Sequence, residues 1–189
     1  PRQLLGSQND MATIRLKRSG KAITLVTLLD EVPIDAARFF FNLREANSHF
    51  DFDLDLAVEE SAQNPVYYVQ YAHARICSIG RMLKQEGITP CKTADCDFSL
   101  LCAEEEKALV RFLARLPQEI IDAAKEYDPA KLTRYAAELA TMFHKFYNAC
   151  RVKCGEEKMM NARYALCMAV KQTLFNVLSL LKITAPDAM

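Results

Sequence analysis

The sequence is poor in residues that interrupt regular structure, with only 5 glycines and 7 prolines among its 189 residues. Hydrophobic residues make up 51% of the chain and charged residues 25%. This composition is typical of a globular helical protein rather than a disordered one, because disordered chains are too polar to form a core. A chain of this length holds one complete domain, or one domain and a piece of another.

Long apolar runs are also missing. No stretch approaches the roughly 18 residues of a membrane span, and the start from Pro1 to Leu5 has no hydrophobic signal core. We therefore expect a cytoplasmic protein that does not contact a membrane. Pro1 in place of an initiator Met, with no helix start near it, indicates a sequence cut from a longer one.

No pair among the seven cysteines has the Cys-x-x-Cys spacing of a zinc knuckle. The number is odd, so reduced thiols are the expected state. A metal site built from Cys91, Cys96 and Cys102, which share one predicted loop, is the alternative. Tetrahedral zinc needs a fourth ligand and more closely spaced pairs, so we expect no metal site.

Catalytic motifs are missing as well. The sequence has no Gly-rich phosphate loop, no Ser-His-Asp order and no His-rich metal pair. Asp51, Asp53 and Asp55 have the residue type for metal or acid–base chemistry, but an acidic helix entrance explains them more simply. We expect no catalytic residue in this chain.

The net charge is zero, which by itself argues against a partner rich in phosphate. The charges are unevenly spread, however. Residues 30–61 and 85–128 are acidic, whereas 62–84 has three bases and no acid, and 131–189 has nine bases against four acids. A fold that joins the two basic segments would create a positive face on a neutral protein.

The first sixty residues give mixed signals. Residues 12–28 alternate basic and β-branched or aliphatic types around Ser19-Gly20, which predicts two short strands joined by a basic loop. A helix is predicted over 30–44. Residues 51–56 alternate acidic and apolar types, which is consistent with a short extended stretch or with the entry to the next helix.

From residue 64 onward, apolar residues recur at three- and four-residue steps. Asn64-Pro65 and Asp128-Pro129 each place a capping residue before a proline, which is typical of a helix start. With short connections, the predicted helices form an α-bundle. They cover 64–87, 99–116, 117–127, 128 to the region of Gly155, and 157–182.

Tyr68, Tyr71 and Arg75 lie three and four residues apart in the first of these helices, so they share one stripe. Aromatic rings beside a guanidinium suit unpaired bases, because rings stack on base faces and arginine adds cation–π and phosphate contacts. The alternative is that the tyrosines are half-buried packing residues. His73, in the same helix, is interpreted as a hydrogen-bonded structural histidine.

The aromatic and basic pattern recurs at Phe146-Tyr147 with Arg151 and Lys153, where core packing is again the alternative for Phe146. A separate basic loop contains Arg15, Lys17, Arg18 and Lys21. It is either a phosphate contact or a solvated turn. Without further information, the residues indicate a helical module that binds RNA.

Several stretches resemble the arginyl-tRNA synthetase family, in consistent order over nearly the whole chain. DAARFFFN at 35–42, SHFDFDLDLA at 48–57 and NPVYYVQYAHARI at 64–76 are similar to the end of the catalytic domain and the first anticodon-domain helix. FHKFYNACRV at 143–152 and the ending at 161–189 resemble the family's later helices. Ala162-Arg163 falls in its Asp-Ala-Leu-Arg-type signature.

The resemblance implies an all-α helical-bundle anticodon-binding domain of class I synthetases over 61–189. A short α/β remnant of the catalytic domain, over 1–60, would precede it. The implied partner is arginine tRNA, bound by a monomer. The residues that resemble the family's anticodon contacts are Tyr71, Arg75 and Tyr147, with Tyr68 as a weaker correspondence and Met189 as the terminal residue that helps to close the pocket.

The resemblance also implies ATP, with Mg, and arginine as ligands of the parent enzyme only. Lys17, Arg18 and Lys21 fall where the family's Lys-Met-Ser-Lys-like ATP loop lies, but the Met-Ser centre is replaced. The His-Ile-Gly-His signature and the nucleotide-binding sheet are absent. We expect this chain to bind tRNA without catalysis, as part of an arginine–tRNA ligase or as a separate degenerate module. A helical protein-interaction module is the remaining alternative.

Overall fold

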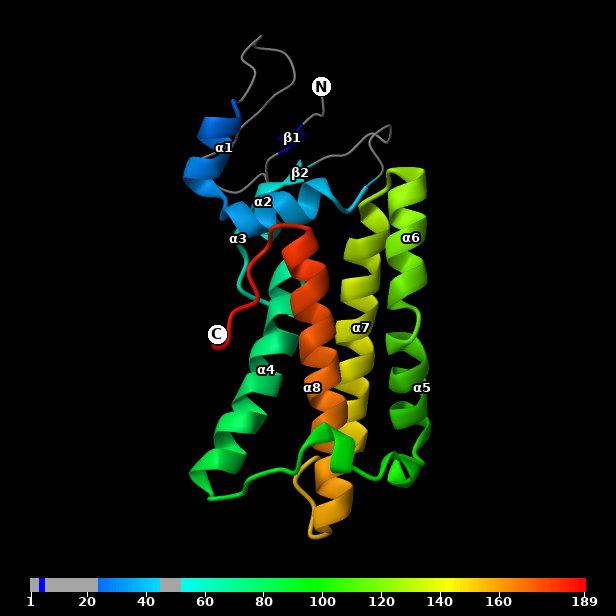
Figure 1. The fold of residues 1–189 in the computed structure, drawn as a ribbon. Helices are drawn as coiled ribbons and strands as arrows, with labels where there is room; N and C mark the ends of the chain where they lie inside the picture. The colour runs from blue at the N-terminus through cyan, green and yellow to red at the C-terminus, as the bar shows by residue number, and fades with distance from the viewer. Residues whose placement is uncertain (1–3, 6–23, 45–51) are drawn as a thin grey trace.

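The computed structural model describes residues 4–5, 24–44 and 52–189. Five helices form an elongated bundle: α4 (Pro65–Gln85), α5 (Glu104–Leu113), α6 (Leu116–Glu126), α7 (Ala130–Ala149) and α8 (Glu157–Leu180). Helix α7 contacts all four others, while α5 and α6 follow one another along its side (Figure 1). The five helices expected from residue 64 onward are confirmed.

Helix α4 starts as its sequence predicts. The side-chain oxygen of Asn64 accepts a hydrogen bond from the backbone N–H of Val66 at 3.2 Å, and Pro65 occupies the first turn. The Asn64 amide also donates to the carbonyl of Glu59 at 2.9 Å. Because this buried amide satisfies groups on both sides of the helix start, it fixes where α4 leaves the preceding segment.

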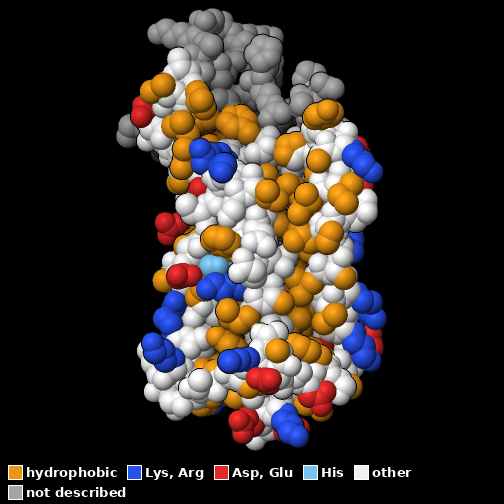
Figure 2. Space-filling view, in the orientation of Figure 1, with side chains coloured by type: hydrophobic (Ala, Val, Ile, Leu, Met, Phe, Trp, Pro, Cys, Tyr) orange, Lys and Arg blue, Asp and Glu red, His pale blue; other side chains and the backbone are white. Residues whose placement is uncertain are grey.

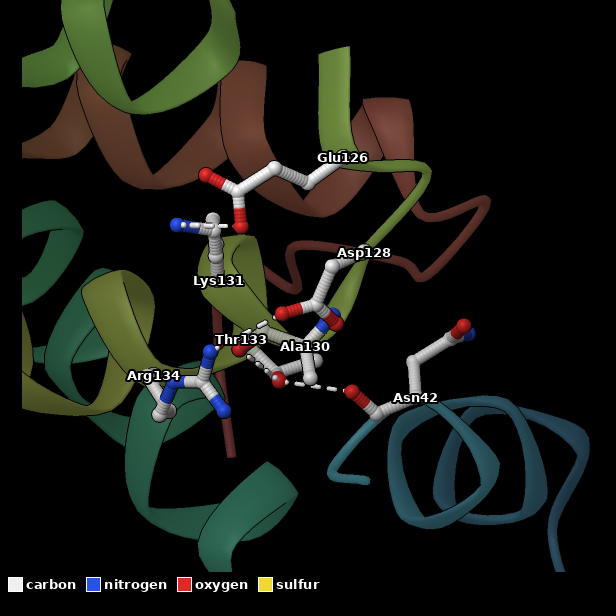
Figure 3. A network of polar contacts seen from close by, with 7 residues as sticks. All are labelled: Asn42, Glu126, Asp128, Ala130, Lys131, Thr133 and Arg134. Atoms are coloured by element: carbon white, nitrogen blue, oxygen red, sulfur yellow. Dashed lines mark hydrogen bonds and ion pairs between the residues drawn. The ribbon is translucent and has the colours of Figure 1, made fainter. Parts of the chain in front are cut away.

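A polar network fixes the start of α7 (Figure 3). One carboxylate oxygen of Asp128 accepts from the Ala130 N–H at 3.0 Å, and the other pairs with Arg134 at 3.1 Å. The Thr133 hydroxyl donates to the carbonyl of Asn42 at 2.8 Å. The expected Asp128-Pro129 start is confirmed, and the same turn holds the end of an earlier helix, α2 (Ile34–Phe41).

The helix expected to begin at Ser99 was wrongly placed, because α5 begins at Glu104. Asp97 accepts a hydrogen bond from the backbone N–H of Ser99 at 3.0 Å, which holds Ser99 in a 3-10 turn, η2 (Phe98–Leu100). Another 3-10 turn, η1 (Thr93–Asp95), precedes it. Local side-chain bonds of this kind compete with helix formation.

The first turn of α5 contains a buried ion pair with α8. Glu106 is 1% exposed, and its carboxylate accepts from the Arg163 guanidinium at 2.7 Å and from the backbone N–H of Ala103 at 2.8 Å. Arg163 also donates to the carbonyl of Arg151 at 2.8 Å. One guanidinium therefore joins α5, α8 and the loop between α7 and α8.

The expectations for the N-terminal part need correction. Residues 24–28 do not extend the predicted second strand, because α1 (Leu25–Glu31) begins there, capped by the Thr24 hydroxyl. The helix expected over 30–44 is split at Pro33, whose ring disfavours helical geometry at Val32. The rest of the predicted hairpin and the basic loop lie outside the described residues.

For residues 51–56, the sequence was consistent with a short extended stretch or with the entry to a helix. The described part, from Phe52 onward, contains both. Strand β2 (Phe52–Asp53) pairs in parallel with β1 (Leu4–Leu5), and α3 (Leu54–Val58) follows at once. The Asp53 carboxylate accepts from the backbone N–H of Leu56 at 3.0 Å and so caps α3. For Asp53, the interpretation as an acidic helix entrance is confirmed.

After α8 the chain turns back through Lys182, which has a left-handed φ of 57°, and runs along α2 and α4. The carboxylate of Asp35 accepts from the Thr184 backbone N–H at 3.2 Å, and Gln70 donates to the Thr184 carbonyl at 2.9 Å. None of the helices in the described parts of the chain combines the length and the apolar character that a membrane span requires.

We predict that Arg163→Met lowers the free energy of unfolding by roughly 3 kcal/mol, because it leaves the buried Glu106 carboxylate without its counter-charge. Urea denaturation followed by circular dichroism measures this loss. Arg111→Met is the matched control, since Arg111 pairs with Glu104 at 3.7 Å on the surface, and it should change stability by less than about 0.5 kcal/mol. Equal losses in the two variants would contradict the structural role of the buried pair.

Candidate nucleic-acid interface

Three of the expected contact residues meet between α4 and α7. The Arg75 guanidinium donates to the Tyr71 hydroxyl at 2.8 Å, and its central carbon lies 4.7 Å from the centre of the Tyr71 ring. The same carbon lies 4.9 Å from the centre of the Tyr147 ring. The juxtaposition of Tyr71, Arg75 and Tyr147 places one cation between two aromatic faces.

Further rings extend this aromatic cluster. Tyr68 packs against His144 with ring centres 4.9 Å apart, and Tyr67 stacks parallel to Tyr71 at 6.4 Å. Sequence reasoning missed Tyr67 and His144. His144 precedes Tyr147 by three residues on α7, so its helical spacing was an available signal.

Arg75 lies at the boundary of two pockets, and its side chain lines both. The smaller pocket, of about 460 Å³, is lined mainly by the aromatic cluster and by residues 60–62. The larger, of about 660 Å³, is lined by Tyr147, Arg151 and Lys153 among others. Concave surfaces with several π faces and few charges suit flat, partly polar ligands such as nucleobases.

The larger pocket brings together the two basic segments found in the sequence. Arg75 comes from the first segment, and Arg151 and Lys153 come from the second, with no acidic residue in the lining. The Arg151 carbonyl is held by Arg163, and Lys153 forms an ion pair with Glu86. The expected convergence of positive charge is confirmed at this pocket.

The charges are not uniform over the whole surface. Figure 2 shows hydrophobic side chains gathered down the middle of one face, with charged side chains mainly along its edges and lower end. On α8, Met168, Phe175 and Leu180 are exposed. The basic lining of the larger pocket thus contrasts with the hydrophobic middle of this face.

His144 is the one histidine of the aromatic cluster. Burial lowers the pKa of its imidazole below the ordinary value of 6.5, and the nearby Arg75 charge lowers it further. Both ring nitrogens are buried without a hydrogen-bond partner in the described part of the chain. His144 is therefore neutral at physiological pH, and a neutral ring packs among aromatic rings without adding a second charge beside Arg75.

The remaining expected site residues differ in position, and among those that the structure describes only Tyr68 lines one of the two pockets. Met189 is 51% exposed at the end of the segment that runs along α4, and it lines neither pocket. Lys17, Arg18 and Lys21 lie outside the described residues. Tyr68 is half-buried, so its packing against His144 agrees with the alternative given for it.

Two structural interpretations are also confirmed. Phe146 is fully buried, as expected for a core residue. His73 is 1% exposed, and its Nδ1 lies 2.9 Å from the carbonyl oxygen of Pro186. Neither side chain belongs to the surface of the aromatic cluster.

One group of potential metal ligands occurs in the described part of the chain. Ligand atoms of His73, Cys77 and Asp187 lie within 4.8 Å of one another. The Cys77 thiol already donates to Asp187 at 3.1 Å, and Lys171 pairs with the same carboxylate at 3.7 Å. These contacts make the group a polar network that anchors the C-terminal segment to α4, although Nε2 of His73 is buried without a hydrogen-bond partner among the described residues.

Comparison with known families identifies the family to which the bundle is similar. Residues 69–189 match the model of the DALR anticodon binding domain. An arginine–tRNA ligase of Caldanaerobacter subterraneus subsp. tengcongensis is 53% identical over 173 residues, which is 92% of this chain and 31% of that protein. One from Acetivibrio thermocellus is 51% identical with the same coverage. The chain thus spans about a third of the length of these relatives.

Solved structures agree with these matches. A Campylobacter jejuni protein assigned as an arginyl-tRNA synthetase superposes with a TM-score of 0.84 at 28% identity, covering 100% of this chain and 40% of that one. The arginyl-tRNA synthetase of Thermus thermophilus superposes with a TM-score of 0.77 at 26% identity, covering 99% and 34%. The all-α fold expected from the sequence is confirmed.

We predict that the His144 imidazole titrates below 6.5 in the folded protein. The unfolded chain then binds a proton at a higher pH than the folded one does, so this residue makes stability fall as pH drops from about 7 to about 5. NMR titration of the imidazole and urea unfolding at both pH values test this. His144→Phe should reduce the pH dependence, whereas a titration at or above 6.5 would contradict the burial of the ring.

Proposed function

The chain belongs to the DALR anticodon-binding domain family, and from this premise we propose that it binds the anticodon region of arginine tRNA as the C-terminal portion of an arginine–tRNA ligase. The family match and the names of the relatives support the proposal. Residues 61–189 would form the tRNA-binding unit. Residues 1–60 would be the end of the catalytic domain.

The observation that carries this proposal is the position of Arg75 between Tyr71 and Tyr147, on the edge of both pockets. Anticodon bases are unpaired, so their faces are free to stack on aromatic rings. Arg75 is already paired with two ring faces, so its guanidinium is oriented before a ligand arrives. Such preorganisation lowers the entropic cost of binding.

The contributions of the individual residues follow from their places in this arrangement. Tyr71 and Tyr147 supply stacking surfaces, Arg75 supplies cation–π and hydrogen-bonding contacts, and Arg151 reaches backbone phosphates from the rim of the larger pocket. Tyr68 supports the cluster through His144. The role of Met189 in closing the pocket stays a prediction.

In the parent enzyme, arginine is activated with ATP and Mg and transferred to the tRNA; these ligands belong to that enzyme as a whole. The binding unit proposed here would hold one end of the tRNA while chemistry takes place elsewhere. The basic loop with Lys17, Arg18 and Lys21 stays a predicted ATP contact. A cytoplasmic location and a monomeric state also stay predictions.

Tyr71→Ala and Arg75→Ala should each weaken the binding of arginine tRNA by roughly 1–3 kcal/mol, as expected for a lost stacking partner. Fluorescence anisotropy with labelled tRNA measures the dissociation constants. Circular dichroism must show that each variant is folded.

Tyr71→Phe and Arg111→Ala are the matched controls for these two variants. Tyr71→Phe keeps the ring and removes only the hydroxyl that Arg75 contacts, so it should lose much less affinity than the alanine variant. Arg111 lines neither pocket, so Arg111→Ala should leave the dissociation constant unchanged. Unchanged affinity in folded Tyr71→Ala protein would rule out the proposed contact.

Binding should also weaken as salt rises, because phosphate contacts release counterions. In a plot of log affinity against log salt, Arg151→Ala should reduce the slope by about 1 if Arg151 contacts one phosphate. The same anisotropy assay over a salt series gives both slopes. Salt-independent binding by the wild-type chain would show that the basic pocket does not meet the tRNA backbone.

A further inference from the structure

Two thiols meet in the loop between α4 and α5. The Sγ atoms of Cys91 and Cys96 lie 3.3 Å apart, and a disulfide bond needs an approach to about 2.05 Å. Cys91 is exposed and Cys96 is half-buried. We propose that Cys91 and Cys96 form a reversible oxidative modification site, which takes a low-molecular-weight disulfide as its oxidant and closes to an intramolecular disulfide.

The local backbone places both sulfurs on one side of the loop. The 3-10 turn η1 lies between them, with the Asp95 N–H donating to the Lys92 carbonyl at 2.8 Å and the Cys96 N–H donating to the Thr93 carbonyl at 3.3 Å. These bonds reverse the chain between the two cysteines. A five-residue separation therefore becomes a direct contact between side chains.

The loop is also fixed to the start of α8. The Cys91 backbone N–H donates to the side-chain oxygen of Asn161 at 3.1 Å, and the Cys96 sulfur lies 3.6 Å from the Asn161 carbonyl oxygen. Asn161 is only 8% exposed, so the helix packing around it fixes its position and that of the loop bonded to it. The proximity of the sulfurs is thus held by contacts outside the loop itself.

The other thiols are engaged differently. Cys102 donates to the carbonyl of Ser99 at 3.2 Å, and Cys150 and Cys167 are buried. Cys77 bonds to Asp187, and Cys154 contacts a backbone carbonyl. In the part of the chain that the structure describes, no second pair of sulfurs makes a comparable contact.

The surroundings of the two thiols determine which of them attacks the external disulfide first and which then closes the intramolecular bond. Burial, together with the contact to Cys91, raises the pKa of Cys96 to about 11, so this thiol keeps its proton at neutral pH. The exposed Cys91 is therefore the sulfur that attacks the external disulfide, because only a thiolate is the effective nucleophile. Cys96 then resolves the adduct.

The exchange balances without a further reagent. Cys91 loses its proton to solvent and bonds to one sulfur of the disulfide R–S–S–R, releasing one thiolate, which takes up a proton to become RSH. Cys96 then attacks the Cys91 sulfur of the mixed disulfide, and its proton passes to the second departing thiolate. The two protein thiols are oxidised, and R–S–S–R is reduced to two RSH.

Glutathione disulfide is the probe, followed by alkylation of free thiols and tryptic mass mapping. Trypsin cuts after Lys92 and Lys107, so the predicted bond joins peptide 85–92 to peptide 93–107. Peptide 93–107 also contains Cys102, and the mapping is therefore done in Cys102→Ser protein. The expected result is this cross-link, with loss of two thiols and full recovery with dithiothreitol.

Single-cysteine variants test the order of attack. Cys96→Ser should stop at a stable glutathione adduct on Cys91. In Cys91→Ser, Cys96 should react about tenfold more slowly than Cys91 does in Cys96→Ser, because its scarcer thiolate is only partly offset by higher nucleophilicity. The proposal is overturned if folded protein keeps both thiols, if Cys91 cross-links elsewhere, or if Cys96 is the faster thiol.

Discussion

A buried carboxylate imposes the central constraint on this fold. Glu106 is almost completely shielded from water, and an unpaired charge there would be strongly destabilising. Arg163 of α8 supplies the counter-charge and, through a second nitrogen of its guanidinium, the bond to the Arg151 carbonyl. The position of α5, the first turns of α8 and the rim of the larger pocket are therefore set by a single guanidinium. Arg163 lies in the segment that resembles the Asp-Ala-Leu-Arg-type signature, and the contacts it makes here are structural.

The proposed binding surface depends on a second set of contacts, those that position α4 and α7. Arg75 reaches Tyr147 only because α4 and α7 pack at a fixed register, and α7 is held at its start by Asp128 and Thr133. The aromatic and basic residues of the pocket thus need few contacts with flexible loops. A site built on packed helices holds its geometry more closely than one built on loops. This is consistent with the proposed contact between these residues and unpaired bases.

Local chemistry made much of this fold predictable. Asn64 and Asp128 cap their helices through bonds within two residues, and Tyr71 meets Arg75 across one helical turn, so sequence spacing was sufficient. The errors came from competing signals. The segment around Pro33 was expected to form one helix, but the proline splits it. Ser99 was expected to begin a helix, but its backbone N–H bonds to the side chain of Asp97 instead. Contacts between distant segments, such as Arg75 with Tyr147, depend on helix packing that no local pattern encodes.

The C-terminal segment bridges α2 and α4, and its contacts bear on the order of folding. Asp35 and Thr184 are 149 residues apart in sequence, yet they are hydrogen-bonded. Closing so long a chain segment is entropically unfavourable, and long-range contacts form slowly. The bundle can therefore assemble first and the bridge afterwards. Opening of that bridge would remove one set of contacts from α2, while the bond between Thr133 and the Asn42 carbonyl still ties the end of α2 to α7 and the tyrosine pocket stays intact.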